Sequence, residues 1–294
     1  MKETLTTDDC EQMDRIGAWS GATKDTANWT LLCGDAQKAM KSIASESVHC
    51  IVTSPPYYCL RDYKIEGQIG LEETVNEYVA SLCKVFEEAY RVLKKDGLFF
   101  LNLGDTYYSG KGESQGADPK SNKRRFGLRP VDKSGGLGID IQRKSIIGIP
   151  WRVAIELMAQ KWILRTPIIW HRKKALPESV QDRPRRSYEY VFMFAKDRKY
   201  YFNRQPLIEK EFDEDVWTIL ARPRANGGID TAPYPDELVE RCLSIGCPTD
   251  GTVLDPFAGS GTTMRVALQT GRNAVGIEIS PIFCDYILKE LQVL

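Results

Sequence analysis

Residues 252–263 read Thr-Val-Leu-Asp-Pro-Phe-Ala-Gly-Ser-Gly-Thr-Thr, and the rest of the chain can be organised around them. Val253 and Leu254 predict a short strand, and a helix over 263–270 follows the glycines. Glycine lets the backbone turn sharply and approach a ligand closely, and the N-terminus of the next helix presents free N–H groups. The stretch therefore predicts a strand, a glycine turn and a helix that can face a ligand.

An acidic residue follows this unit at the end of the next strand. Glu278 lies 23 residues after Asp255, where a carboxylate typically binds ribose hydroxyls. The phosphate-binding pattern Gly-x-Gly-x-x-Gly is absent, since Gly259-Ser-Gly261 is followed by two threonines. The unit therefore predicts a ligand with a ribose but no pyrophosphate, and a turn with a purely structural role is the alternative.

Strands and helices alternate along the chain, which is typical of an α/β fold with a mostly parallel sheet and helices on both faces. We find no internal repeat, and we expect residues 213–235 to form a loop. The predicted strands cover 29–33, 48–53, 98–103, 162–171, 189–195 paired with 200–203, 253–254 and 273–279. The predicted helices cover 36–44, 74–94, 149–161, 236–245 and 263–270, and a last helix is capped by Ser280 with Pro281 at its first position.

A second motif, Ser54-Pro55-Pro56-Tyr57, ends the strand predicted at 48–53. Neither proline has an N–H and each fixes its own φ, so the turn is rigid and cannot continue the strand. It offers a hydroxyl, two proline carbonyls without competing donors, and an aromatic face. This combination suits a flat group that donates hydrogen bonds, such as the amino edge of a nucleobase, although a plain turn is the alternative.

Composition restricts the class of protein. The 294 residues carry 40 basic and 40 acidic side chains, so the formal net charge is zero and any surface for nucleic acid must be local. The eight cysteines include no Cys-x-x-Cys pair and there are two histidines, so neither a metal site nor a disulfide framework is predicted. No secretion signal or membrane span is visible, and we expect reduced, mostly buried cysteines in a cytoplasmic protein.

Two segments depart from the alternating pattern. Residues 1–28 are polar and predict a loosely attached N-terminal arm, with one domain over 29–294. Residues 107–147 are rich in glycine and serine, and hold nine basic and four acidic side chains. A long stretch without periodicity inside a compact domain is typically functional or disordered. A second basic stretch covers 161–186, and a solvated charged loop is the alternative for both.

The two motifs together resemble those of DNA methyltransferases that methylate exocyclic amino groups with S-adenosylmethionine. Because Ser54-Pro-Pro-Tyr57 precedes Asp255-Pro-Phe-x-Gly-x-Gly261, the chain resembles the circularly permuted β class, over roughly residues 29–290. This resemblance implies a Rossmann-like methyltransferase fold, S-adenosylmethionine as cofactor, and duplex DNA as partner. Cys33-Gly34-Asp35 resembles the segment that contacts the adenosine, and residues 215–217 and 232–235 resemble the segments beside the methionine.

The resemblance assigns roles to individual positions. The implied catalytic residues are Ser54, Pro55, Pro56 and Tyr57. The implied cofactor-binding residues are Asp35, Trp217, Pro233, Asp255, Pro256, Phe257, Gly259, Gly261, Thr262 and Glu278. For DNA binding we expect Lys123, Arg124, Arg125, Arg172, Lys173, Lys174, Arg183 and Arg185. The gap between residue 200 and Trp217 is too short for the recognition segment often found there in the family, so we expect 107–147 to be a basic, mobile recognition insertion.

The implied reaction is direct methyl transfer to a base flipped out of the duplex. Tyr57 would stack on the base, and the Ser54 hydroxyl and Pro55 carbonyl would accept its two amino N–H bonds. Serine at position 54 usually accompanies methylation of cytosine N4, whereas Asp or Asn accompanies adenine N6. Adenine N6 therefore stays open as the alternative, and an RNA or protein-glutamine methylase or an inactive DNA-binding homologue is more remote.

Cys59 and His171 carry side chains that could take part in catalysis. Cys59 follows Tyr58 rather than the proline that precedes the nucleophile of cytosine-C5 methylases, so we interpret it as structural. His171 is interpreted as a surface residue at a strand end. A restriction endonuclease and a second copy of the chain are left open as further partners.

Overall fold

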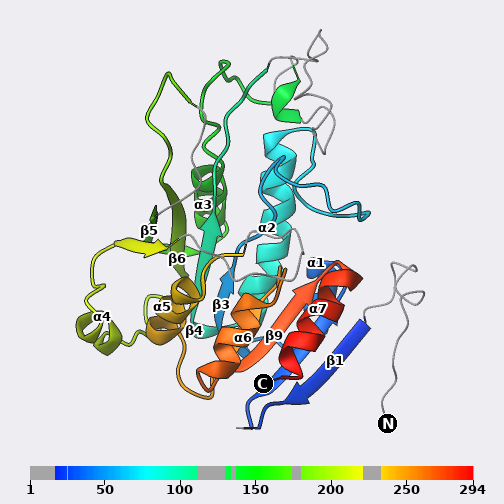
Figure 1. Cartoon of the computed structure of the whole chain (residues 1–294), viewed down its shortest axis with the longest axis vertical. Helices are drawn as coiled ribbons and strands as arrows, with labels where there is room; N and C mark the ends of the chain where they lie inside the picture. The colour runs from blue at the N-terminus through cyan, green and yellow to red at the C-terminus, as the bar shows by residue number, and fades with distance from the viewer. Residues whose placement is uncertain are drawn as a thin grey trace.

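The computed structural model describes residues 17–24, 26–110, 130–133, 137–173, 180–220 and 233–293. Its core is a nine-stranded sheet in the order β1-β2-β9-β8-β3-β4-β6-β5-β7 (Figure 1). The strands are β1 (Gly17–Ala22), β2 (Asn28–Cys33), β3 (Val48–Thr53), β4 (Leu93–Leu103), β5 (Ile163–Lys173), β6 (Tyr188–Ala195), β7 (Val216–Leu220), β8 (Thr252–Asp255) and β9 (Asn273–Glu278). The expected α/β fold with a mostly parallel sheet is confirmed.

The sheet brings the two motifs of the sequence together. Strands β2, β9, β8, β3 and β4 run parallel to one another, whereas β1 is antiparallel to β2, and β6 is antiparallel to both β4 and β5. Strand β8 pairs directly with β3, with Ile51 opposite Leu254, although about two hundred residues separate them in the sequence. Because the carboxyl ends of parallel strands lie at one edge, Ser54 and Asp255 begin adjacent turns at that edge.

Helices cover both faces of the sheet. On one face pack α1 (Ala36–Met40), α2 (Val75–Val92) and α3 (Ile149–Ala159), and on the other α5 (Asp236–Gly246), α6 (Thr262–Gln269) and α7 (Pro281–Leu291), which Figure 1 shows side by side. Strand β4 alternates between the two cores: Phe99 and Leu101 pack on the first face, and Leu98 and Phe100 on the second. Both faces of the central strands are thus buried, as the predicted helix–strand alternation requires.

The helix boundaries follow from local capping chemistry. Helix α2 begins with a capping box, in which the Thr74 hydroxyl accepts from the Glu77 N–H and the Glu77 carboxylate accepts from the Thr74 N–H. Ser280 caps α7, and its hydroxyl accepts from Phe283 N, as the sequence predicts. A short helix α4 (Gln205–Glu209) and a 3₁₀ turn η2 (Pro130–Asp132) complete the structure of the described residues.

Three expectations about secondary structure are corrected. Residues 17–22, placed in the polar arm, form the edge strand β1, which pairs antiparallel with β2. Residues 200–203 are not a strand; β6 pairs instead with β4 and β5. Residues 216–220, placed in a loop, form β7, whose side chains alternate between exposed and buried. Strands β1 and β7 lie at the two ends of the sheet, and their pairing comes from the neighbouring strand rather than from a long apolar run.

The described parts of 107–147 contain no regular strand and no α-helix. Tyr107 forms an isolated bridge with Ile146, and η2 lies between the two. The expectations for Lys123, Arg124, Arg125 and Lys174 fall outside the described residues. Seven cysteines lie within the described part of the chain, and all seven are buried thiols. No helix there is long and apolar enough to cross a membrane.

Candidate active site

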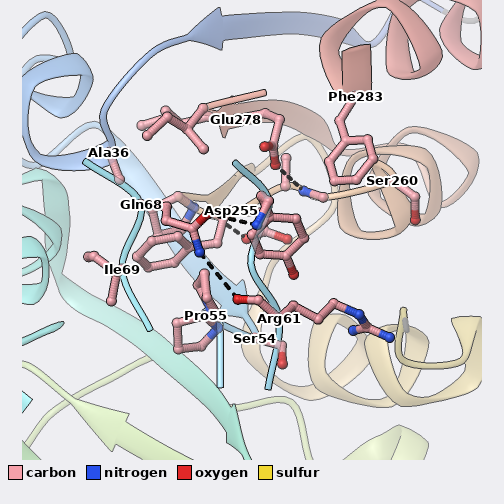
Figure 2. Close-up of a pocket in the computed structure, with 18 of the residues that line it drawn as sticks. Ala36, Ser54, Pro55, Arg61, Gln68, Ile69, Asp255, Ser260, Glu278 and Phe283 are labelled. Carbon is pink, nitrogen blue, oxygen red and sulfur yellow. Dashed lines mark hydrogen bonds between the residues drawn. The ribbon is translucent and has the colours of Figure 1, made fainter. Parts of the chain in front are cut away.

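A pocket opens at the carboxyl edge of the sheet, between the turns that follow β2, β3, β8 and β9. Figure 2 shows Glu278 and Phe283 toward one end, Ser54 and Pro55 toward the other, and Asp255 between them. The residues predicted from the sequence that line this pocket are Asp35, Ser54, Pro55, Pro56, Tyr57, Pro233, Asp255, Pro256, Phe257, Gly259, Thr262 and Glu278. The structure therefore brings together residues from five separate segments of the chain.

The glycine turn shapes one wall of the pocket. Gly259 and Gly261 both have positive φ, at 55° and 79°, a backbone conformation in which L side chains are strained. Beside Gly259 the nearest atom to an added Cβ would be the Phe257 carbonyl oxygen at 3.9 Å, so the backbone faces open space. Gly261 caps α6 and packs against Ile287 rather than lining the pocket. Its contribution is to the shape of the turn.

Glu278 is buried beside this turn. Its Oε2 accepts from Gly259 N at 2.7 Å, and its Oε1 accepts from Ser280 N at 2.9 Å. Burial raises the pKa of Glu278 from 4.5 to about 7, although the two backbone bonds oppose the shift, and the nearby Asp255 carboxylate adds to it. Each carboxylate oxygen keeps a second acceptor site. Glu278 can therefore accept from a hydroxyl in the pocket while it fixes the glycine turn.

Asp255 connects four segments beneath the pocket. Its Oδ1 accepts from Thr53 Oγ1 at 2.6 Å and from Phe257 N at 3.0 Å. Its Oδ2 accepts from Thr263 Oγ1 at 2.6 Å and from the Tyr234 hydroxyl at 3.1 Å. Burial raises the pKa of this carboxyl, while these four donors lower it. Asp255 thus holds the ends of β3 and β8, the start of α6 and Tyr234 in one arrangement.

Asp35 lies at the end of β2. It is the N-cap of α1, where its Oδ1 accepts from Lys38 N at 2.8 Å. Asp35 also lines the pocket, as does its neighbour Ala36, which Figure 2 labels. The site thus carries three carboxylates. Asp35 and Glu278 keep acceptor sites that suit a ligand rich in hydrogen-bond donors, whereas Asp255 is engaged by its four protein donors.

The Ser54–Tyr57 turn is held from outside the pocket. The Tyr78 hydroxyl on α2 donates to the Pro56 carbonyl at 2.8 Å. The expectation that both proline carbonyls lack competing donors is therefore wrong for Pro56, because the sequence gives no sign that Tyr78, 22 residues later, faces it. Of the two proline carbonyls, that of Pro55 therefore remains the candidate acceptor for a substrate.

Tyr57 is part of a buried polar network. Its hydroxyl donates to Glu189 Oε2 at 2.5 Å and lies 3.1 Å from Asn102 Oδ1. The Ser54 hydroxyl donates to Tyr57 across a longer 3.4 Å. Burial and the adjacent Glu189 carboxylate raise the pKa of Tyr57 well above its usual range, so the hydroxyl stays protonated. The sequence singled out neither Glu189 nor Asn102, because they lie on β6 and β4, far from the motif in sequence.

Known proteins with a similar sequence are DNA methyltransferases. Residues 48–289 match the N6/N4 family model described as DNA methylase. The chain belongs to this DNA methylase family. It is 40% identical over 269 residues to the Type II methyltransferase M.Cfr9I of Citrobacter freundii, covering 90% of this chain and 87% of the relative. It is 40% identical over 258 residues to the Type II methyltransferase M.SmaI of Serratia marcescens, covering 85% of this chain and 86% of the relative.

Solved structures agree with this assignment of the fold. The DNA methylase is similar to TTHA0409 of Thermus thermophilus, a DNA modification methylase complexed with S-adenosyl-L-methionine, at 26% identity and a TM-score of 0.60; the match covers 89% of this chain and 93% of the other. It also shares its fold with the PvuII cytosine-N4-specific DNA methyltransferase, at 20% identity and a TM-score of 0.69, over 93% of this chain and 90% of the other.

One expected cofactor residue lies elsewhere in the methylase. Trp217, expected beside the methionine, does not line the pocket but is buried in β7. Its indole N–H donates to Glu214 O at 3.1 Å, and its ring packs at a right angle against Phe212. The Arg241 guanidinium lies 5.8 Å from its centroid. Trp217 therefore belongs to the hydrophobic core on the side of the sheet that α5 covers.

The pocket also contains residues that sequence analysis missed. The segment 60–69 contributes Arg61, Tyr63 and Gln68, and Figure 2 shows Gln68 facing Arg61. Gln68 ties the segment together, because its Nε2 donates to Arg61 O at 3.2 Å and its Oε1 accepts from Tyr63 N at 2.7 Å. The Tyr63 ring meets Phe283 of α7 edge-on. This segment follows the Ser54–Tyr57 turn, but it carries no periodic signal.

Basic side chains gather at the same edge of the sheet. Arg172 and Lys173 end β5, which runs parallel to β4 because both are antiparallel to β6. The Arg183 guanidinium stacks on the Tyr107 ring, 3.9 Å from its centroid, and Arg185 is exposed. Lys144 pairs with Asp182 at 2.7 Å, which joins the two basic stretches. The described DNA-binding candidates thus lie near the carboxyl ends of β4 and β5, at the edge of the sheet where the pocket opens.

Cys59 and His171 are both engaged structurally. Cys59 is buried in the first core, and its backbone N–H donates to Gly70 O at 2.7 Å. His171 lies on β5, half-buried, with its Nδ1 3.2 Å from Thr218 Oγ1 of β7. Neither lines the pocket.

Proposed function

We propose that this DNA methylase transfers a methyl group from S-adenosylmethionine to the exocyclic N4 of cytosine in duplex DNA, after the base has flipped out of the helix. The observation that carries the proposal is the single pocket shared by the Ser54–Tyr57 turn and the Gly259–Glu278 unit. A donor of the methyl group and its acceptor can meet only where such sites are continuous.

The residues of the pocket fit S-adenosylmethionine. Glu278 has acceptor sites for ribose hydroxyls, and the open space beside Gly259 lets that part of a ligand approach the backbone. Asp35 would accept from the adenine amino group, and Pro233 and Asp255 lie toward Ser54, where the methionine would be held. The absence of a third glycine in the turn agrees with a ligand that lacks a pyrophosphate. When bound, this cofactor supplies an electrophilic methyl group on a sulfonium.

The residues of the Ser54–Tyr57 turn would position the amino group of the base. Ser54 Oγ and the Pro55 carbonyl oxygen accept its two N–H bonds, and Tyr57 stacks on the ring. The nitrogen lone pair then forms the new N–C bond as the C–S bond breaks, and the electron pair of that bond stays on sulfur. The nitrogen finally releases one proton to solvent. Positioning and well-placed acceptors account for the rate, and no covalent enzyme intermediate is needed.

The choice of cytosine over adenine rests on Ser54. Serine in this position usually accompanies cytosine N4 in the family, and the structural neighbour from the PvuII system is cytosine-N4-specific. Adenine N6 is the second candidate, because its amino group can donate the same two hydrogen bonds. The names of the Type II relatives favour neither base.

The basic side chains at the carboxyl edge of the sheet support duplex DNA as the partner. Lys173, Arg183 and Arg185 can reach phosphates or guanine edges next to a flipped base, whereas Arg172 is held in its ion pair with Glu189. The Type II relatives support a role beside a restriction endonuclease, and a cytoplasmic location.

A second copy of the chain is a further partner, supported by α3. Its side chains Trp151, Ile155 and Met158 are 38%, 62% and 50% exposed and lie on one helix face. Arg152 and Glu156 are exposed beside them, and an antiparallel copy of α3 would bring each opposite the other. Light scattering should give the mass of a dimer, and Ile155→Glu should return a monomer. A wild-type monomer at micromolar concentration would contradict this pairing.

The Ser54→Ala variant tests the proposed site. It should bind S-adenosylmethionine with unchanged affinity, yet transfer labelled methyl groups to unmodified genomic DNA at least tenfold more slowly than the wild type. The variant should fold normally, because the only side-chain hydrogen bond of Ser54 among the described residues is the long contact to Tyr57. Transfer at the wild-type rate would refute the role of the Ser54 hydroxyl.

A further inference from the structure

The surroundings of the Tyr57 hydroxyl determine which way its hydrogen bonds run. Glu189 Oε2 lies 2.5 Å away and Asn102 Oδ1 lies 3.1 Å away, and both are acceptors. The third neighbour is Ser54 Oγ at 3.4 Å. A tyrosine hydroxyl has one hydrogen to donate, and a carboxylate can only accept it. Tyr57 therefore donates toward Glu189 and presents its lone pair to Ser54.

The orientation of Asn102 supports the same direction. Its Nδ2 donates to Tyr190 O at 3.0 Å and to Glu189 Oε2 at 3.3 Å, which leaves its Oδ1 facing Tyr57. Arg172 fixes the other side of Glu189, since its NH1 donates to Glu189 Oε1 at 2.8 Å. The Glu189 side chain is 10% exposed, so this ion pair is shielded from water. The carboxylate is held in place by three neighbours and points one oxygen at Tyr57.

This direction has a consequence for Ser54. A serine hydroxyl also has a single hydrogen, and here it points to Tyr57. The oxygen of Ser54 then presents only lone pairs to the pocket, as an acceptor for an amino N–H. A Ser54 hydrogen turned into the pocket would instead meet the two hydrogens of the amino group.

We propose that Glu189 is a positioning residue for methyl transfer: by accepting from Tyr57 it fixes the stacking ring and leaves Ser54 as a pure acceptor toward the amino group of the base. This inference rests on the proposed function and adds to it a carboxylate that does not itself touch the substrate. Glu189 acts through Tyr57, so its removal should affect turnover rather than cofactor binding.

The Glu189→Gln variant should reverse the direction of the network. Arg172 still needs an acceptor, so the amide oxygen of the new side chain faces Arg172 and its NH₂ group faces Tyr57. Tyr57 then accepts from position 189, and its own hydrogen can turn to Asn102 Oδ1 or to Ser54 Oγ, so the direction of the Ser54 hydrogen bond is no longer fixed. We expect kcat to fall at least tenfold, while the Kd for S-adenosylmethionine, measured by calorimetry, stays within twofold. Glu209→Gln, at an exposed position on α4, is the matched control and should retain wild-type kcat.

A double-mutant cycle separates this role from a structural one. Tyr57→Phe keeps the ring and removes the hydroxyl, so kcat should again fall at least tenfold. In the Tyr57→Phe background, Glu189→Gln should lower kcat less than threefold further, because the two residues act through one hydrogen bond. If Glu189 served only to hold Arg172, its loss would be as large in either background. The Tyr57→Phe measurement also stands alone if Glu189→Gln does not fold.

The outcomes distinguish this inference from the proposed function. Wild-type protein that methylates no DNA would remove the basis of both. An active wild type with an equally active Glu189→Gln or Tyr57→Phe variant would overturn only the role of Glu189. A further loss of threefold or more in the Tyr57→Phe background would overturn it as well.

Discussion

Lowering the pH from 8 to 6 should weaken binding of adenosine and of S-adenosylmethionine to this methylase, because a proton on Glu278 competes with the ribose. The pKa of Glu278 is raised to about 7 by burial. Only the ionised carboxylate keeps all its acceptor sites for the ribose hydroxyls. If binding requires this form, the apparent Kd scales as 1 + 10^(pKa − pH), which gives about a tenfold increase between pH 8 and pH 6.

The assay is calorimetric titration at pH 6, 7 and 8 with adenosine, which carries the ribose without the titratable methionine part. Repeating it in buffers of different ionisation enthalpy should show release of up to one proton near pH 6. Glu278→Gln is the control: its Kd should be weaker than that of the wild type at pH 8, and nearly independent of pH. A wild-type Kd that is unchanged between pH 8 and pH 6 would refute the reasoning.

The same shift predicts the pH dependence of stability. The folded-state pKa of Glu278 lies above the unfolded value of 4.5, so the folded protein binds more protons between these values. The contribution of Glu278 to the free energy of unfolding therefore falls as the pH rises toward 7. Relative to Glu278→Gln, the wild type should be more stable at pH 6 than at pH 8 by about 1.3 kcal/mol. Urea unfolding at both pH values measures the difference, and an opposite sign would contradict it.

Three further changes test the frame of the pocket. Tyr78→Phe removes the hydrogen bond to the Pro56 carbonyl and should cost about 1 kcal/mol of stability, seen as a lower urea midpoint; no change would mean that α2 does not hold the turn. Asp255→Ala leaves three hydroxyls and one backbone N–H without their buried acceptor and should cost about 3 kcal/mol, read in the same assay, whereas a loss under 1 kcal/mol would contradict its connecting role. Gly261→Ala places a Cβ 3.0 Å from Ile287 at a φ of 79° and should lower stability by about 1–2 kcal/mol, so an unchanged melting temperature would argue against strain in the turn.

The sequence is sufficient to predict those site residues that lie in consecutive strands and turns of the chain. Gly259 and Glu278 could be predicted because a strand, a turn, a helix and a second strand follow one another, and parallel strands end at one edge. The Ser54–Tyr57 turn could be predicted for the same reason, since two prolines stop a strand at that edge. Their meeting in one pocket needed only the α/β alternation and the resemblance to the methyltransferases.

Contacts across the fold could not be predicted in this way. Glu189 meets Tyr57 across 132 residues, and no spacing in the sequence records that β6 lies beside β4. Trp217 was placed at the pocket by family resemblance, but the alternation in β7 buries it under α5 instead. A period of two over only five residues is a weak signal, so the sequence predicts a loop where the structure has the edge strand β7.

The central claim is tested most directly by the identity of the methylated nucleoside. Unmodified duplex DNA would be incubated with the full chain and S-adenosylmethionine, digested to nucleosides and analysed by mass spectrometry, with Ser54→Ala as the slower control. The account predicts N4-methylcytosine. N6-methyladenine would contradict the choice of base, and the absence of any methylated nucleoside would contradict methyl transfer to DNA itself.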